Sequence, residues 1–172
     1  MKRAKYVFNE YLIEPTILEN TRKNKNIIYG ARAMNSQIGV LKINRPTTDF
    51  DIFSRKPKKS AQQLERELDK RTGGDFFYVK QAKHQGTTKV MNKGVDMRKN
   101  TRDDFGVADF TNIPKPKPRT TNINGIKYVT LSHVSKTKRK ALKDKRYAFR
   151  HRKDREDLNL IKIHRKIKGR YL

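Results

Sequence analysis

The sequence predicts an α+β fold, in which helices flank a small mixed sheet and basic helices follow at the C-terminus. Short apolar runs typical of strands alternate with stretches of helical periodicity as far as residue 131. From residue 132 onward the pattern is helical, basic and free of proline. We therefore divide the chain into an N-terminal helical segment (1–24), a core (25–131) and basic C-terminal helices (132–172) that pack on the core or extend from it.

The first strand and the two helices around it follow from local patterns. Residues 4–19 mix aromatic and aliphatic side chains, which predicts a helix that breaks near Pro15. The apolar run 27–29 predicts a short buried strand that ends at Gly30. Residues 31–40 carry apolar side chains at helical spacing, so the first unit reads strand, glycine turn, helix.

The next unit is a strand followed by the best-marked helix of the chain. Residues 48–54 alternate strictly, with Phe50 and Ile52 on one face and Asp49, Asp51 and Phe53 on the other. Residues 56–59 predict a turn, after which Ser60 and Gln63 match a capping box. Gly73 and Gly74 end this helix.

The rest of the core consists of predicted strands. Residues 76–79 and 87–91 predict a hairpin around 84–86, followed by a polar loop over 92–104. Residues 106–111 predict another strand, stopped by three prolines. The turn residues 122–125 precede the last predicted strand, 126–131.

Composition restricts the classes of protein that the chain can be. Only 34% of the 172 residues are hydrophobic, which suffices for one modest core. The chain has no cysteine, which excludes disulfides, thiolate zinc sites and cysteine nucleophiles. No apolar run approaches the ~20 residues of a membrane span, and no apolar stretch follows the charged N-terminus. We expect a cytoplasmic or virion-associated protein that is neither secreted nor bound to a membrane.

The charge is unevenly distributed along the chain. The formal net charge is +26, and residues 111–172 alone carry 20 basic and four acidic side chains. Such a basic segment is the electrostatic footprint of a nucleic-acid-binding protein. The competing interpretation is a solvated basic face or an interaction tail.

The basic C-terminal residues are our candidates for the nucleic-acid-binding site. They occupy nearly every helical angle, which suits burial in a nucleoprotein or in a packaged genome, with binding that salt weakens. Tyr147 and Phe149 lie among them and could stack on bases, although packing in the core is the favoured interpretation of both. The candidates are Lys136, Lys138, Arg139, Lys140, Lys143, Lys145, Arg146, Arg150, Arg152 and Lys153.

Three aspartates occupy unusual places for so basic a chain. Asp49 and Asp51 point to the same face of a predicted strand, with Cβ atoms ~7 Å apart. Asp109 interrupts an apolar strand, where aspartate is depleted. Carboxylates that converge repel one another unless a cation lies between them, and hard oxygen ligands suit Mg²⁺ or Mn²⁺. Alternatively, Asp49 and Asp51 are ordinary strand-end residues, one at a turn and one paired with a lysine.

These motifs together resemble a known enzyme superfamily. The segments 30–35, 45–52 and 107–109 are similar to the active-site frame of the DNA polymerase beta-type nucleotidyltransferases, especially the small and viral members that include poly(A) polymerases of large DNA viruses. Residues 152–158 resemble a Lys-Asp-x-x-Asp-Leu helix that recurs near the end of such domains. Ala31 stands where the pattern has a second glycine or a serine.

The resemblance implies a site and a reaction. Asp49, Asp51 and Asp109 would bind the metal ions, and Gly30, Ala31 and Arg32 would contact the phosphates of a nucleoside triphosphate substrate. A glycine-opened helix N-terminus supplies free N–H groups for such phosphates. The resemblance therefore implies a metal-dependent nucleotidyltransferase that acts on nucleic acid.

Other chemistries are weaker alternatives. The four histidines lack the spacing of a zinc site, and neither a serine-hydrolase elbow nor a Walker-type phosphate loop occurs. A metal-dependent nuclease is a rival, with Asp51 beside Lys56 or Lys58, or Asp109 beside Lys115. The second hypothesis is a non-catalytic nucleic-acid-binding protein that keeps the fold, as part of a virion or a ribonucleoprotein.

Overall fold

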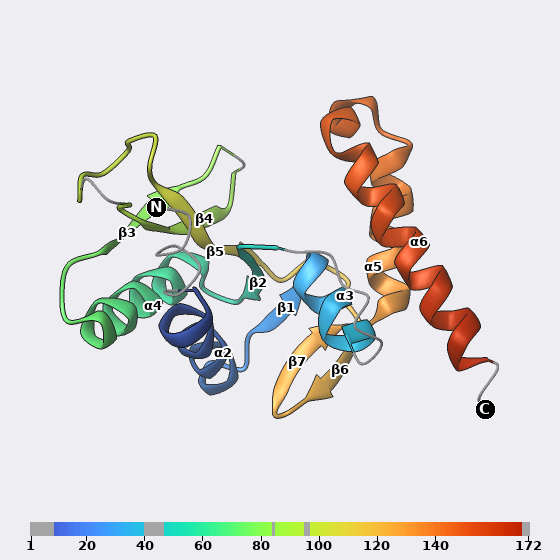
Figure 1. The fold of residues 1–172 in the computed structure, drawn as a ribbon, viewed down its shortest axis with the longest axis horizontal. Helices are drawn as coiled ribbons and strands as arrows, with labels where there is room; N and C mark the ends of the chain where they lie inside the picture. Colours follow the sequence, from blue (N-terminus) through green and yellow to red (C-terminus); the bar gives the residue numbers. More distant parts are fainter. Residues whose placement is uncertain (1–8, 40–46, 84, 95–96, 170–172) are drawn as a thin grey trace.

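The computed structural model describes residues 9–39, 47–83, 85–94 and 97–169. Figure 1 shows a sheet with helices packed beside it. In chain order the elements are η1 (Asn9–Ile13), α2 (Glu14–Lys23), β1 (Ile27–Tyr29), α3 (Gly30–Ile38), β2 (Phe50–Ser54), α4 (Pro57–Thr72), β3 (Phe77–Gln81), β4 (Thr87–Asn92), β5 (Phe105–Asn112), β6 (Thr120–Ile123), β7 (Ile126–Val129), α5 (Leu131–Leu142), η3 (Lys145–Arg150) and α6 (His151–Lys168).

The seven strands form one mixed sheet in the order β3-β4-β5-β2-β1-β7-β6. Strand β2 lies at its centre, parallel to β5 and antiparallel to β1. Strand β1 is parallel to β7, and both outer pairs, β3 with β4 and β6 with β7, are antiparallel hairpins. The prediction of a small mixed sheet with flanking helices is confirmed.

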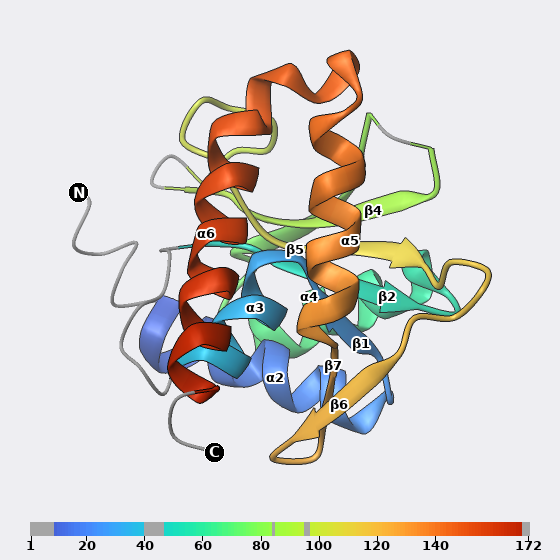
Figure 2. The ribbon, with the colours of Figure 1, turned by 90° about the vertical axis from the view of Figure 1, so that its right-hand side faces the viewer.

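The helices form two groups around this sheet. Helix α4 packs on β3, β4 and β5, and α2 lies beside α4. Helix α3 packs on β1 and β2 and also contacts α5 and α6, which run antiparallel side by side (Figure 2). We call the segment 131–168 the C-terminal hairpin. No helix in the described ranges is long and apolar enough to cross a membrane.

One hydrophobic core joins the three parts of the chain. Ile13 and Ile17, near the start, are fully buried in it. Val134 of α5 and Ile161 of α6 belong to the same cluster, so the C-terminal hairpin is anchored to the core. Charge therefore does not prevent the basic helices from packing, because each contributes an apolar side chain to this core.

The N-terminal helical segment breaks near Pro15, as predicted: the π-helical turn η1 ends at Ile13 and α2 begins at Glu14. Pro15 lies in the first turn of α2, where its missing N–H leaves no helical hydrogen bond unmade. The expected segment 4–8 lies outside the described residues.

Helix α4 begins earlier than the capping box predicted. Pro57 starts the helix, and Ser60 lies inside it, where its hydroxyl shares a 2.7 Å hydrogen bond with the Ser54 hydroxyl. The capping-box prediction is therefore wrong, whereas the predicted end is right: Gly73 closes the helix at φ +74°.

Strand β6 is absent from the prediction. The turn is only Asn124-Gly125, with φ values of +51° and +79°, which joins two antiparallel strands as a tight hairpin. The polar strand before this turn carries no hydrophobic alternation, and the sequence therefore gives no periodic signal for it. Strand β7 ends at Val129, and residue 131 already starts α5.

Candidate active site

The structure brings two of the predicted aspartates together on neighbouring strands. The parallel register of β2 and β5 places Asp51 opposite Asp109, and Asp49 lies two residues before Asp51 at the entrance to β2. On the other side of β2, Asp51 pairs in register with Tyr29 of β1. Asp49 and Asp109, 60 positions apart in the sequence, thus both lie near Asp51 at one end of the central strand pair.

Gly30 is required at this point for a steric reason. Its φ is +68°, and a Cβ at this position would collide with Oδ2 of Asp51. A glycine therefore lets the Asp51 carboxylate lie directly against the first turn of α3. Tyr29, the N-cap residue, makes no side-chain capping hydrogen bond, so the first amides of α3 keep the capacity to bind an anion.

Aromatic packing holds the strands in place behind the carboxylates. The rings of Tyr29 and Phe53 stack with centroids 3.9 Å apart, and the Tyr29 hydroxyl lies 3.2 Å from the hydroxyl of Thr111 on β5. Burial raises the pKa of Tyr29, so its hydroxyl stays protonated. These contacts link β1, β2 and β5 and fix the backbone that carries Asp51 and Asp109.

The carboxylates open into a cleft of about 450 Å³. One wall comes from the start of α3 and the approach to β2, and the other comes from the C-terminal hairpin, which lies beside α3 in Figure 1. The cleft therefore combines an acidic floor with a largely basic wall. Its lining residues are Gly30, Ala31, Thr47, Thr48, Asp49, Asp51, Lys138, Phe149, Arg150, Lys153 and Asp154.

The environment of Asp51 disfavours its charged form. Burial, followed by repulsion from Asp49 and Asp109, raises the pKa of the Asp51 carboxyl to about 7, although Arg150 and Lys138 act in the opposite direction. A buried carboxyl beside two further carboxylates is suited to bind a cation.

We expect the raised pKa of Asp51 to make stability depend on pH. The Asp51 carboxyl ionises near pH 4 in the unfolded chain but near pH 7 in the folded one, so its ionisation destabilises the fold as pH rises between these values. In EDTA, Asp51→Asn should therefore stabilise the protein against urea by on the order of 2 kcal/mol at pH 8, and by much less at pH 4.

Glu156→Gln is the matched control, since Glu156 is half-exposed on α6 and makes only a 3.6 Å contact with Arg152. It should leave stability nearly unchanged at both pH values. If the free energy of unfolding of Asp51→Asn and that of the unmodified protein changed with pH in parallel, the raised pKa of the Asp51 carboxyl would be contradicted.

Asp109 has a cation beside it already. Lys89 of β4 lies opposite Asp109 in the strand register, and its Nζ is 2.8 Å from Oδ2 of Asp109. The Oδ1 of Asp49 accepts a 3.3 Å hydrogen bond from the Thr47 hydroxyl. Sequence reasoning did not single out Lys89, because only the β4–β5 register places it there.

The aspartates of the cleft fit a metal ion whose coordination shell is completed by phosphate, rather than one whose ligands all come from the protein. Within the described ranges, no group of three or more acidic, histidine or cysteine side chains is arranged to hold a metal. Mg²⁺ in proteins commonly takes one or two carboxylates and completes its shell with water and substrate phosphates. The adjacent Asp49 and Asp51 match this requirement, and Asp109 would join them on leaving Lys89.

Arg32 lies away from the phosphate-binding position expected from the sequence. Its guanidinium forms a 2.9 Å ion pair with Glu14 and lies 4.1 Å above the Phe50 ring. Successive residues of a helix project about 100° apart, so Ala31 faces the cleft while Arg32 faces α2. The expectation for Arg32 is thus corrected: this side chain supports the fold.

Lys138 also differs from the expectation. It is 5% exposed, with its Nζ 2.9 Å from Asp154 and 2.6 Å from Asp157, both of which are fully buried. Arg150 also binds Asp154, at 3.1 Å. Lys138 therefore joins α5 to α6 from inside the hairpin and is not available as a surface contact for nucleic acid.

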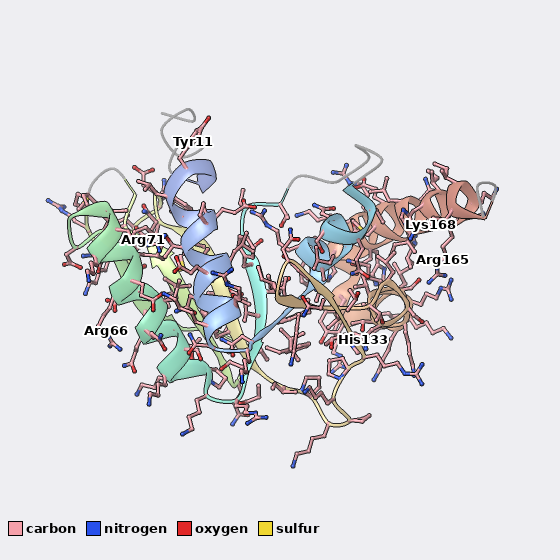
Figure 3. All side chains as sticks on the ribbon, turned by 90° about the horizontal axis from the view of Figure 1, so that it is seen from below. Tyr11, Arg66, Arg71, His133, Arg165 and Lys168 are labelled. Carbon is pink, nitrogen blue, oxygen red and sulfur yellow. The ribbon has the colours of Figure 1, made fainter. Side chains whose placement is uncertain are left out.

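The other basic candidates do lie on the surface. Arg146 binds Asp144, and the rest of the list is exposed on α5, η3 and α6. The sequence-based selection missed the second half of α6, where Arg165 and Lys168 lie near the C-terminal end (Figure 3). A second groove of about 450 Å³ runs between α5 and α6, with apolar Leu158 and Ile161 and a basic rim of Arg139, Lys162, Arg165 and Lys166.

Of the comparisons with known proteins, the one with solved structures bears on the fold. No protein-family profile matches the sequence, and no curated protein matches it. The structure is similar to the Megavirus polyadenylate synthase, with a TM-score of 0.68 and 16% identity over 93% of this chain. It is less similar to two Helicobacter pylori proteins, a candidate nucleotidyltransferase (TM-score 0.48, 12% identity, 73% of this chain and 54% of the other) and JHP933 (0.46, 12%, 73% and 53%).

The chain spans about a third of the Megavirus protein, since the match covers 34% of that chain. Its fold is nucleotidyltransferase-like and resembles that of the viral poly(A) polymerase, as the sequence predicted. At this identity the likeness establishes the fold alone.

Proposed function

We propose that the chain is a metal-dependent nucleotidyltransferase that adds nucleotides to a nucleic-acid acceptor. The observation that carries the proposal is that Asp49 and Asp51 line a cleft beside Gly30 with a basic opposite wall. Asp109 lies in register with Asp51 on the neighbouring strand. The nucleotidyltransferase-like fold supports it. The Megavirus protein is named a polyadenylate synthase, and the synthesis of polyadenylate is a reaction of this class.

The chain's own residues can be given roles in this reaction. Asp49 and Asp51 would hold Mg²⁺ or Mn²⁺, which when bound draws in the triphosphate and stabilises negative charge on it. The amides of Gly30 and Ala31, with Arg150 and Lys153 on the opposite wall, would contact the phosphates.

Asp109 would help to deprotonate the acceptor hydroxyl once its carboxylate has left Lys89. The hydroxyl oxygen would bond to the α-phosphorus as the bond from that phosphorus to the bridging oxygen breaks, and pyrophosphate would leave. The hydroxyl proton would pass to Asp109 or to water. The exposed lysine and arginine side chains of the C-terminal hairpin would hold the phosphate backbone of the acceptor, with an affinity that falls steeply with salt concentration.

One observation favours the alternative, a nucleic-acid-binding structural protein without turnover, such as a virion or ribonucleoprotein component. Lys89 neutralises Asp109 at 2.8 Å, and this ion pair takes the carboxylate that would serve the acceptor hydroxyl. The net charge of +26 suits either function.

The unmodified protein distinguishes the two functions. We expect radiolabelled nucleoside triphosphate to enter a single-stranded RNA or DNA acceptor with Mg²⁺ or Mn²⁺, and EDTA to stop it. If no nucleotide enters any acceptor with either metal, while salt-sensitive binding of the acceptor is retained, the structural function is correct.

A further inference from the structure

Phe149 is the most exposed large apolar side chain among the described residues, at 84%. By contrast, Phe50, Phe77 and Phe110, which lie on strands of the sheet, are almost completely buried. Burial of a phenylalanine stabilises a fold through the hydrophobic effect, and Phe149 largely lacks this contribution. The sequence favoured core packing for it, and the structure corrects this.

The turn that carries Phe149 is well defined. Asp144 caps η3 by accepting a 3.0 Å hydrogen bond from the Arg146 amide. The His151 ring nitrogen Nε2 lies 3.0 Å from the carbonyl oxygen of Ala141, which ties the start of α6 to the end of α5. Phe149 is therefore presented by a braced turn at the end of the hairpin.

The surroundings of Phe149 indicate the chemistry of its partner. It lines the same cleft as Asp49 and Asp51, next to Arg150 and Lys153. A ligand for this place must offer a flat apolar face together with negative charge. A nucleotide has both. Its nucleobase can stack on an aromatic ring, and its phosphates can bind the neighbouring Arg150 and Lys153 side chains.

We propose that Phe149 is a stacking platform for a nucleobase, with Arg150 and Lys153 contacting the phosphates attached to it. This inference rests on the proposed function only in taking the ligand to be a nucleotide. The base is that of the triphosphate or that of the acceptor's terminal nucleotide, two sources with the same chemistry.

The absence of tryptophan from the chain gives a direct test. Phe149→Trp places a single tryptophan on the proposed platform of the 172-residue chain, and a stacked base should quench its emission. The titration is carried out separately with ATP and Mg²⁺ and with a short single-stranded oligonucleotide. The ligand that quenches the tryptophan emission identifies the source of the stacked base. Tripolyphosphate, which has no base, should not quench it.

Tyr11→Trp is the matched control. Tyr11 is 72% exposed and lies on η1, at the other end of the molecule from α6 in Figure 3, so its tryptophan should not respond. Phe149→Ala should also weaken binding of the quenching ligand about fivefold or more, whereas Phe149→Tyr should preserve it and neither should change tripolyphosphate binding.

The proposal is overturned if emission from position 149 is unchanged by saturating ligand in both titrations. It is also overturned if Phe149→Ala weakens tripolyphosphate as much as the nucleotide ligand. Quenching without incorporation by the unmodified protein would leave the stacking site intact and refute the transferase. Incorporation without quenching would refute the stacking site alone.

Discussion

Replacing Asp49 and Asp51 together by asparagine is expected to lower nucleotide incorporation by at least about a thousandfold. Both amides keep the shape of the carboxylates but lose the charge that would hold a divalent cation. The affinity for single-stranded nucleic acid should stay within about twofold of that of the unmodified protein, because the exposed lysine and arginine side chains of the C-terminal hairpin are unchanged. Single-turnover incorporation and fluorescence anisotropy measure the two quantities on the same preparation.

Glu156→Gln again supplies the control, since it removes one negative charge from an exposed part of α6. It should alter neither incorporation nor binding. Incorporation that survives in the double asparagine variant would show that the cleft is not the active site. A parallel loss of nucleic-acid affinity would show instead that the two carboxylates support the binding surface.

The sequence predicts the acidic floor of the cleft because that feature depends on local patterns. Strict alternation puts Asp49 and Asp51 on one strand face. The structure confirms a strand over Phe50–Ser54, with Asp51 on it and Asp49 just before it. Gly30 is recognisable as the end of an apolar run. Its steric role toward Asp51 becomes evident only when β1 and β2 pair.

The partners of these residues could not be predicted, because they come from strand register and helix rotation. Lys89 reaches Asp109 only through the antiparallel pairing of β4 with β5. Arg32 meets Glu14 because α3 turns that face toward α2. A sequence shows that both side chains are charged but does not show which charges lie across a sheet or between helices.

The C-terminal hairpin shows the same limit. Basic side chains at almost every helical angle conceal which of them is buried, and so Lys138 and the exposed Lys136 are indistinguishable by composition. The one local signal is Asp154 and Asp157, three residues apart, which lie on one helix face. Their burial against Lys138 turns that acidic pair into the internal link between α5 and α6.

Lys138→Met is expected to destabilise the protein by about 3 kcal/mol, since it leaves the buried Asp154 and Asp157 without their shared ammonium group. Arg150 would still bind Asp154, which limits the loss. Urea unfolding at pH 7 measures the effect. A thermal midpoint lowered by roughly 6–12 °C should accompany it.

Lys136→Met is the matched substitution, two residues earlier on the same helix and exposed, and should change stability by less than about 0.5 kcal/mol. Asp157→Asn added to Lys138→Met should recover part of the lost stability, because one buried negative charge is removed. Where the protein remains folded, Lys138→Met should weaken nucleic-acid binding no more than Lys136→Met does. A selective loss of nucleic-acid affinity without loss of stability would instead assign Lys138 to the binding surface, because a lysine that links two helices from within cannot be removed without cost to the fold.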